Sequence, residues 1–123
     1  MDHRSAVLAL VAALAVTAPA AAKAAGACPG PKASAGTTVH GPVLQIPDDG
    51  VICVALGQSP STWTQVRLPR PAPARSTLMA AAFAKNVSCV IGLDGAGSCL
   101  IEGEPLSAAL QRAKTLQASM TWR

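Results

Sequence analysis

The sequence DGVICVALGQSPSTWTQVRL, residues 49–68, contains a turn, an apolar run, a polar loop and a second strand-like run in close succession. The turn begins at Pro47 and ends on Asp49-Gly50. Residues 51–56 are apolar and largely β-branched, and residues 63–68 mix apolar with polar side chains. Turn residues between β-branched runs are typical of antiparallel strands, so we predict two strands joined by a loop. In the second strand we expect the apolar side chains to face one side and the polar ones the other. The first set is Trp63, Val66 and Leu68, and the second is Thr64, Gln65 and Arg67.

Three further strands are predicted on either side of this stretch. Residues 37–46 form the first strand, and Gly41-Pro42 in its middle predicts a bulge or a barrel corner. Residues 86–93 alternate in strand fashion, and a glycine-rich turn leads from them to a short fifth strand over residues 98–101. The face of the fourth strand that we expect to be buried consists of Val87, Cys89, Ile91 and Leu93.

Two helices complete the pattern. Residues 75–85 favour a helix, and Leu78, Met79, Ala82 and Phe83 fall at helical spacing facing the core. Residues 69–73 before it contain three prolines and are therefore an extended loop, because proline lacks the N–H that helix interiors and central strands need. Pro105 is suited to the start of a second short helix. Its apolar face consists of Leu106, Ala109, Leu110 and Ala113.

The order of elements predicts a β-rich α+β domain over residues 37–113. Three strands, a helix, two strands and a helix fit a small five-stranded OB-type Greek-key barrel with one or two short helices. Residues 114–123 are left open as a tail, a frayed helix or a short strand. One domain fits the length of 123 residues, and 50% hydrophobic residues with 13% charged residues argue against disorder.

The N-terminus has the features of a signal peptide over residues 1–22. A short charged start precedes the apolar residues 6–16, a run too short to span a bilayer, and small residues follow Pro19. A membrane anchor and a lipoprotein signal at Cys28 are the alternatives. We expect residues 23–36 to form a flexible leader, which a disulfide at Cys28 would pin. The mature chain would have no transmembrane segment and would be periplasmic or secreted.

Export would place the four cysteines in an oxidising compartment, where disulfides persist. Three pairings are possible. We favour Cys89–Cys99, because both residues lie on neighbouring apolar runs joined by a short turn, and this leaves Cys28–Cys53. Buried free thiols are the alternative. A zinc site is not expected, since the chain has no Cys-x-x-Cys and His40 is the one histidine after residue 22.

Several local patterns together resemble the thermonuclease, or staphylococcal-nuclease-like, family, whose fold is the OB fold. Asp49-Gly50 resembles the Asp-Gly-Asp-Thr turn of the family, and Val66-Arg67-Leu68 resembles its Val-Arg-Leu. The other matching segments, in the same order as in the family, are residues 78–89, residues 94–98 and residues 102–110. The resemblance implies a phosphodiesterase that uses calcium, with carboxylates on the metal, a base for water and arginines on the phosphate.

The chain departs from the family at most of those catalytic positions. Val51 replaces a metal carboxylate, and the second metal carboxylate falls on Pro71 or Ala72. The base falls on Ala74 and the second arginine on Ser98, so only Arg67 matches a catalytic position. We therefore assign no catalytic residue and expect no cofactor. Calcium would be required only if the chain is an atypical nuclease.

The remaining candidates are charged residues near the expected active site. Asp48 and Asp49 could hold a weak cation, although aspartates at such positions commonly shape a turn. Arg67, Arg70 and Arg75 are candidates for contacts with nucleic acid. The net charge is +4, but the basic residues are scattered along the sequence and aromatic residues are few. Both features argue against a dedicated nucleic-acid binder.

Three functional hypotheses follow. The first is an exported thermonuclease-like domain that has lost its catalysis and serves as a binding or envelope-associated module. The second is an atypical secreted calcium-dependent nuclease, and the third is an unrelated secreted β-rich structural or inhibitor-like protein. The physiological partner is not identified by any of these patterns.

Overall fold

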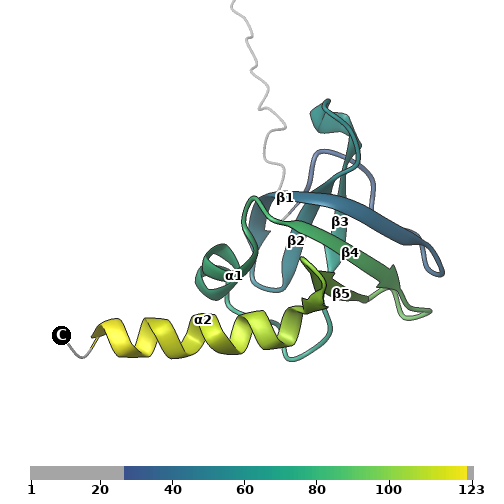
Figure 1. Ribbon diagram of the computed structural model, residues 1–123. Coiled ribbons are helices and arrows are strands. Elements are labelled where there is room, and N and C mark those ends of the chain that lie inside the picture. The colour runs from purple at the N-terminus through teal and green to yellow at the C-terminus, as the bar shows by residue number, and fades with distance from the viewer. Residues whose placement is uncertain (1–26, 122–123) are drawn as a thin grey trace, which may run out of the picture.

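The computed structural model describes residues 27–121 of the chain. The predicted signal peptide, the first residues of the predicted leader and the last two residues lie outside this range. Figure 1 shows a strongly curved sheet with two helices along one side of it.

Six strands form the sheet, in the order β3-β2-β1-β4-β5-β6, and every pair of neighbours is antiparallel. The strands are β1 (Thr38–Asp48), β2 (Val51–Ala55), β3 (Trp63–Arg67), β4 (Asn86–Ile91), β5 (Gly97–Ile101) and β6 (Glu104–Pro105). The helices are α1 (Arg75–Ala82) between β3 and β4, α2 (Leu106–Thr121) after β6, and a 3₁₀ turn, η2 (Pro60–Thr62), before β3.

The predicted β-rich α+β class is confirmed, whereas a closed five-stranded barrel is not, because the sheet is open and has a sixth strand. This strand exists because Glu102 and Gly103 both have positive φ, 49° and 89°. They reverse the chain, so that Glu104 and Pro105 pair with Ile101 and Leu100. The helix that was expected to begin at Pro105 therefore begins one residue later.

The long first strand changes partner at Gly41-Pro42, where the sequence predicts a bulge or a corner. Residues 38–42 pair with β4, and the strand pairs with β2 from Val43 onward. A Cβ added to Gly41 would lie 2.1 Å from the carbonyl oxygen of Ala55, so β1 and β2 approach each other too closely for any side chain. Glycine is thus required at the point where β1 changes from pairing with β4 to pairing with β2.

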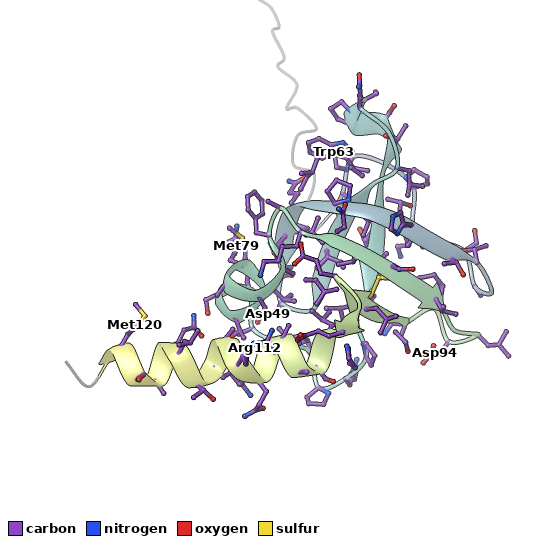
Figure 2. The ribbon with its side chains drawn as sticks, in the orientation of Figure 1. Asp49, Trp63, Met79, Asp94, Arg112 and Met120 are labelled. Carbon is purple, nitrogen blue, oxygen red and sulfur yellow. A yellow bond between two sulfur atoms is a disulfide. The ribbon has the colours of Figure 1, made fainter. Side chains whose placement is uncertain are left out.

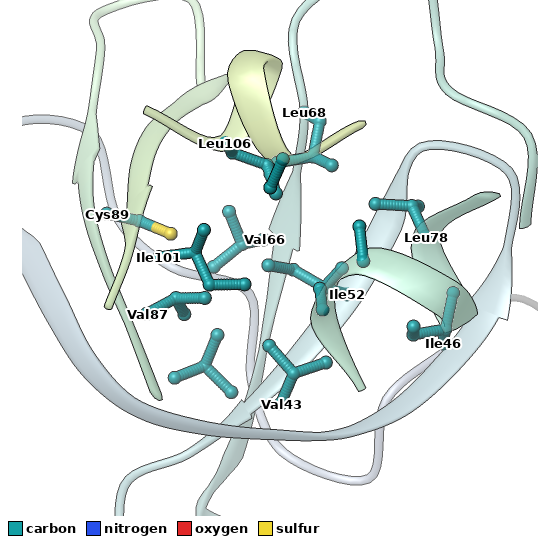
Figure 3. Packing of buried hydrophobic residues seen from close by; sticks show 14 of the residues in the cluster. Val43, Ile46, Ile52, Val66, Leu68, Leu78, Val87, Cys89, Ile101 and Leu106 are labelled. Carbon is teal, nitrogen blue, oxygen red and sulfur yellow. The ribbon is translucent and has the colours of Figure 1, made fainter. Parts of the chain in front are cut away.

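The core fills the concave side of the sheet and is closed by the helices. Val43, Ile46, Ile52, Val66 and Leu78 are among the side chains that are fully buried or nearly so. Figure 3 shows them converging between α1 and the first turn of α2, where Leu106 packs. Of the face predicted for α2, Leu106, Ala109 and Ala113 are buried and Leu110 is half-buried.

Several residues lie on other faces than the sequence predicted. Thr64 is buried and Trp63 is only half-buried, because Trp63 and Val66 are three residues apart and so point to opposite faces of a strand. Met79 and Phe83 are 36% and 43% exposed, since α1 ends at Ala82 and buries Thr77, Leu78, Ala81 and Ala82. Leu93 is 95% exposed because β4 ends at Ile91.

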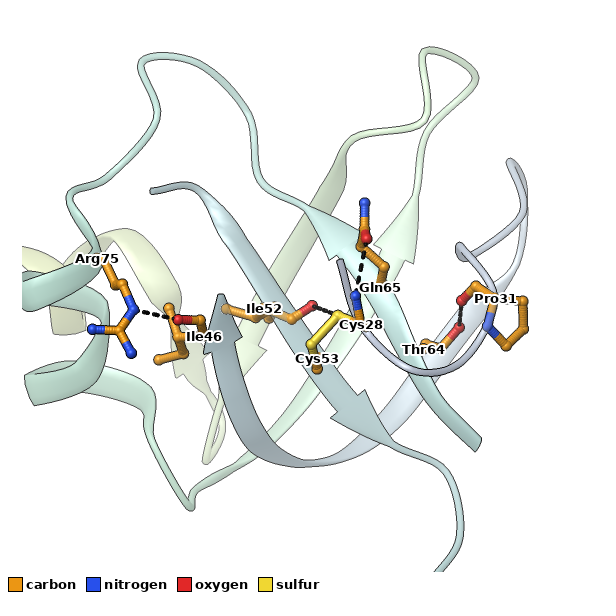
Figure 4. The surroundings of a disulfide bond; sticks show 8 residues. All are labelled: Cys28, Pro31, Ile46, Ile52, Cys53, Thr64, Gln65 and Arg75. Carbon is orange, nitrogen blue, oxygen red and sulfur yellow. Dashed lines mark hydrogen bonds between the residues drawn. A yellow bond between two sulfur atoms is a disulfide. The ribbon is translucent and has the colours of Figure 1, made fainter. Parts of the chain in front are cut away.

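The segment that was predicted to be a flexible leader is, from Cys28 on, tied to the sheet. Gly30 and Ala33 donate backbone hydrogen bonds to Trp63 and Gln65, and Gln65 donates one to Pro31. The hydroxyl of Thr64 donates to the same Pro31 carbonyl at 2.6 Å. A disulfide between Cys28 and Cys53 fixes the segment to β2, as Figure 4 shows. The segment is thus pinned at Cys28, and it also pairs with the edge of the sheet, which its composition does not reveal.

The second disulfide joins Cys89 and Cys99, which lie directly opposite each other on β4 and β5. Both disulfides are thus those of the favoured pairing, and no described cysteine is free. Residues 114–121, left open as a tail, continue α2, whose last turns extend past the sheet and carry the exposed Leu116 and Met120 (Figure 1). Between residues 27 and 121, no helix has the length and apolar character needed to cross a bilayer.

Candidate functional site

Arg67, the match to a catalytic arginine, is engaged in a structural contact. Its guanidinium Nη2 donates a hydrogen bond of 2.7 Å to the backbone carbonyl of Asp94, in the turn between β4 and β5. The carboxylate of Asp94 accepts from the backbone N–H of Ala96, and residues 67 and 96 form an isolated parallel bridge. Figure 2 labels Asp94 at the far end of the β4–β5 hairpin. Arg67 therefore links the end of β3 to this turn.

Replacing Arg67 by alanine is expected to lower the free energy of unfolding by about 1 kcal/mol, because an exposed hydrogen bond from a charged donor contributes roughly this much. Urea denaturation followed by Trp fluorescence measures the change. Arg70→Ala is the matched control, with an expected change within about 0.5 kcal/mol, since the Arg70 side chain has no hydrogen bond or ion pair within residues 27–121. An intact fold together with lost DNA cleavage in the Arg67 variant would contradict a structural role.

Asp48, Asp49 and Arg75 lie together at the β1–β2 turn, where all three have structural partners. The Asp49 carboxylate accepts a hydrogen bond of 2.8 Å from the backbone N–H of Arg75, at the start of α1. The Asp48 carboxylate accepts from the backbone N–H of Asp49, also at 2.8 Å. The Arg75 side chain donates to the carbonyl of Ile46 (Figure 4). This arrangement favours the turn-shaping interpretation of the two aspartates over a cation site.

Arg70 lies at a groove between the proline-rich loop and the opposite end of the sheet. The groove has a volume of about 580 Å³ and is largely apolar. It is lined by residues 68–71 and Pro73 on one wall and by Gly97, Ser98, Cys99, Leu100, Pro105, Leu106, Ser107 and Leu110 on the other. The first wall is the loop after β3, and the second is formed by β5, the end of β6 and the start of α2.

Two of the positions to which the resemblance assigns catalytic residues, Pro71 and Ser98, lie on opposite walls of the groove, whereas Val51, Arg67 and Ala74 do not line it. Arg70 is the one predicted candidate on its surface. Leu100, Leu106 and Leu110 were not predicted as site residues. Their local patterns indicate only a strand and a helix, and no sequence signal places β5 and α2 opposite the proline loop.

Calcium does not fit the residues present at this groove. The lining residues include no Asp or Glu, whereas calcium needs several oxygen ligands with carboxylates among them. Nor do residues 27–121 contain any cluster of three or more His, Cys, Asp or Glu side chains that could hold a metal ion.

Beside the groove, Glu104 of β6 and Arg112 of α2 form an exposed ion pair, with 2.7 Å between Oε2 and Nη1. Hydrogen bonding to Arg112 lowers the pKa of the Glu104 carboxyl below its ordinary value, and the same bond raises the pKa of Arg112. The pair joins the short sixth strand to α2, and it neutralises the charge of Arg112. Arg67 and Arg75 donate to carbonyl groups, whereas Arg70 lines the groove and its side chain has no hydrogen bond or ion pair with any described residue.

We compared the chain with known families, proteins and structures. No protein-family model, no curated protein and no solved structure matches the chain.

Proposed function

We propose that this chain is an exported, non-catalytic binding domain of OB type, related to the thermonucleases, whose binding site is the groove between the proline loop and β5. The single observation that carries the proposal is the character of this groove. It is large enough for a ligand, it is largely apolar, and its described lining residues include no carboxylate that could hold a metal or act as a base.

The topology supports the OB-type part of the proposal. The first strand pairs with both β2 and β4, a helix lies between the third and fourth strands, and the end of β3 approaches the start of β5 through the bridge of residues 67 and 96. A small barrel of this kind needs the same neighbours. Two disulfides are compatible with a periplasmic or extracellular location.

The proposal predicts that the purified, oxidised protein does not cleave plasmid DNA when calcium is titrated to millimolar concentration. The reason is that the metal ligands and the base act on the same step, and the groove supplies neither. Gel electrophoresis follows cleavage, and a thermal melt with and without calcium measures metal binding. We expect intact plasmid and an unchanged melting temperature.

The control is a chelator. Cleavage that the chelator abolishes would overturn the proposal in favour of the atypical calcium-dependent nuclease, with Asp48, Asp49 or another acidic residue in the lost roles. Salt-sensitive DNA binding without cleavage would leave the domain non-catalytic and would make nucleic acid its ligand.

A further inference from the structure

The shape and lining of the groove point to a small ligand. Its volume of about 580 Å³ falls within the range of roughly 300–1,000 Å³ that is usual for small-molecule sites. Among its lining residues, Leu68 is buried, whereas Leu100 is 47% exposed and Leu110 is half-buried. Leucine and proline side chains from both walls thus offer an apolar surface that an alkyl chain can cover.

Arg70 is the one basic residue among the described residues that line this apolar surface. Its side chain has no hydrogen bond or ion pair within residues 27–121. Within the same range, no acidic residue lines the groove and could compete for the Arg70 guanidinium. Its planar guanidinium presents paired donors that match a carboxylate or a phosphate. Ser98 and Ser107 add hydroxyl groups to the same lining.

A nucleotide fits this site less well than an alkyl chain does. None of the described residues that line the groove is aromatic, and bases bind proteins chiefly by stacking on aromatic side chains. The combination of an apolar cleft with a single unpaired arginine favours a ligand with a hydrocarbon body and one anionic end.

We infer that the groove binds a single-chain amphiphile with an oxyanion head group, a fatty-acid-like carboxylate or an alkyl phosphate. Arg70 holds the head group, and Leu68, Leu100 and Leu110 contact the chain. This inference rests on the proposed binding function and names the class of its ligand.

Isothermal titration of the purified, oxidised protein with dodecanoate and with dodecyl phosphate, below their critical micelle concentrations, tests the inference. Binding of either with one ligand per chain is expected, and shortening the chain by one methylene should weaken it about threefold. Dodecanol, which lacks the charge, should bind about tenfold more weakly than the anion.

Two variants locate the site, and each has a matched control. Arg70→Ala should weaken binding of the anion about tenfold and leave dodecanol unaffected, whereas Lys114→Ala, which removes a positive charge from an exposed site outside the groove, should change neither. Leu100→Ser should weaken both ligands about fivefold, and Leu93→Ser, at a fully exposed leucine outside the groove, should weaken neither. Thermal melts establish that each variant is folded.

The inference is overturned if neither amphiphile binds, if binding does not depend on chain length, or if Arg70→Ala and Leu100→Ser bind as the unaltered protein does. Tighter binding of a nucleoside monophosphate at the same site would also overturn it. None of these binding experiments tests nuclease activity, so the inference about the ligand can fail while the proposed non-catalytic function stands.

Discussion

Replacing Cys28 and Cys53 together by alanine is expected to lower the free energy of unfolding by about 3.5 kcal/mol. The two residues are 25 positions apart. On the chain-entropy model, a disulfide that closes a loop of this length raises the free energy of the unfolded chain by about 3.5 kcal/mol, because it lowers the entropy of that chain. A domain of this size has a total stability of only about 5–15 kcal/mol, so the loss is a large fraction of it.

Chemical denaturation of the variant and of the unaltered protein measures this difference. Hydrogen exchange provides a local readout, because the N–H of Gln65 is bonded to the carbonyl of Pro31 in the segment that Cys28 holds. We expect this amide to exchange faster in the variant, since the segment loses its covalent tie to β2. The control is the double variant Cys89→Ala with Cys99→Ala, which opens a shorter loop of 10 positions between β4 and β5. In this control the amide of Gln65 should stay protected from exchange. Equal protection in both variants would show that residues 28–33 are held by their hydrogen bonds alone.

Replacing Gly41 by alanine is expected to cost about 3 kcal/mol. The added Cβ would lie 2.1 Å from the carbonyl oxygen and 3.1 Å from the carbonyl carbon of Ala55. Both atoms belong to the backbone of β2, so no side chain can rotate away, and two strands must move apart where β1 changes partner. We expect the pairing of Val43 with Val54 to be weakened first.

Urea denaturation measures this cost, and Gly57→Ala is the control. A Cβ at Gly57 would lie 3.2 Å from the hydroxyl oxygen of Thr62, an exposed-loop side-chain contact that can relax, so we expect a change below about 1 kcal/mol there. If the two glycine variants were equally stable, β1 and β2 would have room to separate, and the close approach would not be the reason for a glycine at position 41.

Local patterns in the sequence were enough to place most of the elements. The strands at residues 51–56 and 86–93 and the apolar face of α2 agree with the structure to within about two residues, because hydrophobic periodicity reports directly which side chains a strand or helix buries. The turn at Asp49-Gly50 and the break at Gly41-Pro42 were found because glycine and proline constrain the backbone locally.

Errors arose where a residue is placed by a partner far away in the chain. Residues 28–33 look flexible by composition and are nonetheless fixed to β3 and β2. The charged candidates show the same limit. Asp49 caps the start of α1 and Arg67 binds the Asp94 carbonyl, two contacts that span 26 and 27 residues.

The sequence by itself thus determined the α+β class and most of the element boundaries, since these depend on periodicity and turn chemistry. It favoured one of three cysteine pairings, and the structure selected that pairing. Only the tertiary structure decided which arginine is available for a ligand and where the groove lies. Both depend on β5, α2 and the proline loop meeting in space, and the contacts that bring them together leave no periodic trace in the chain.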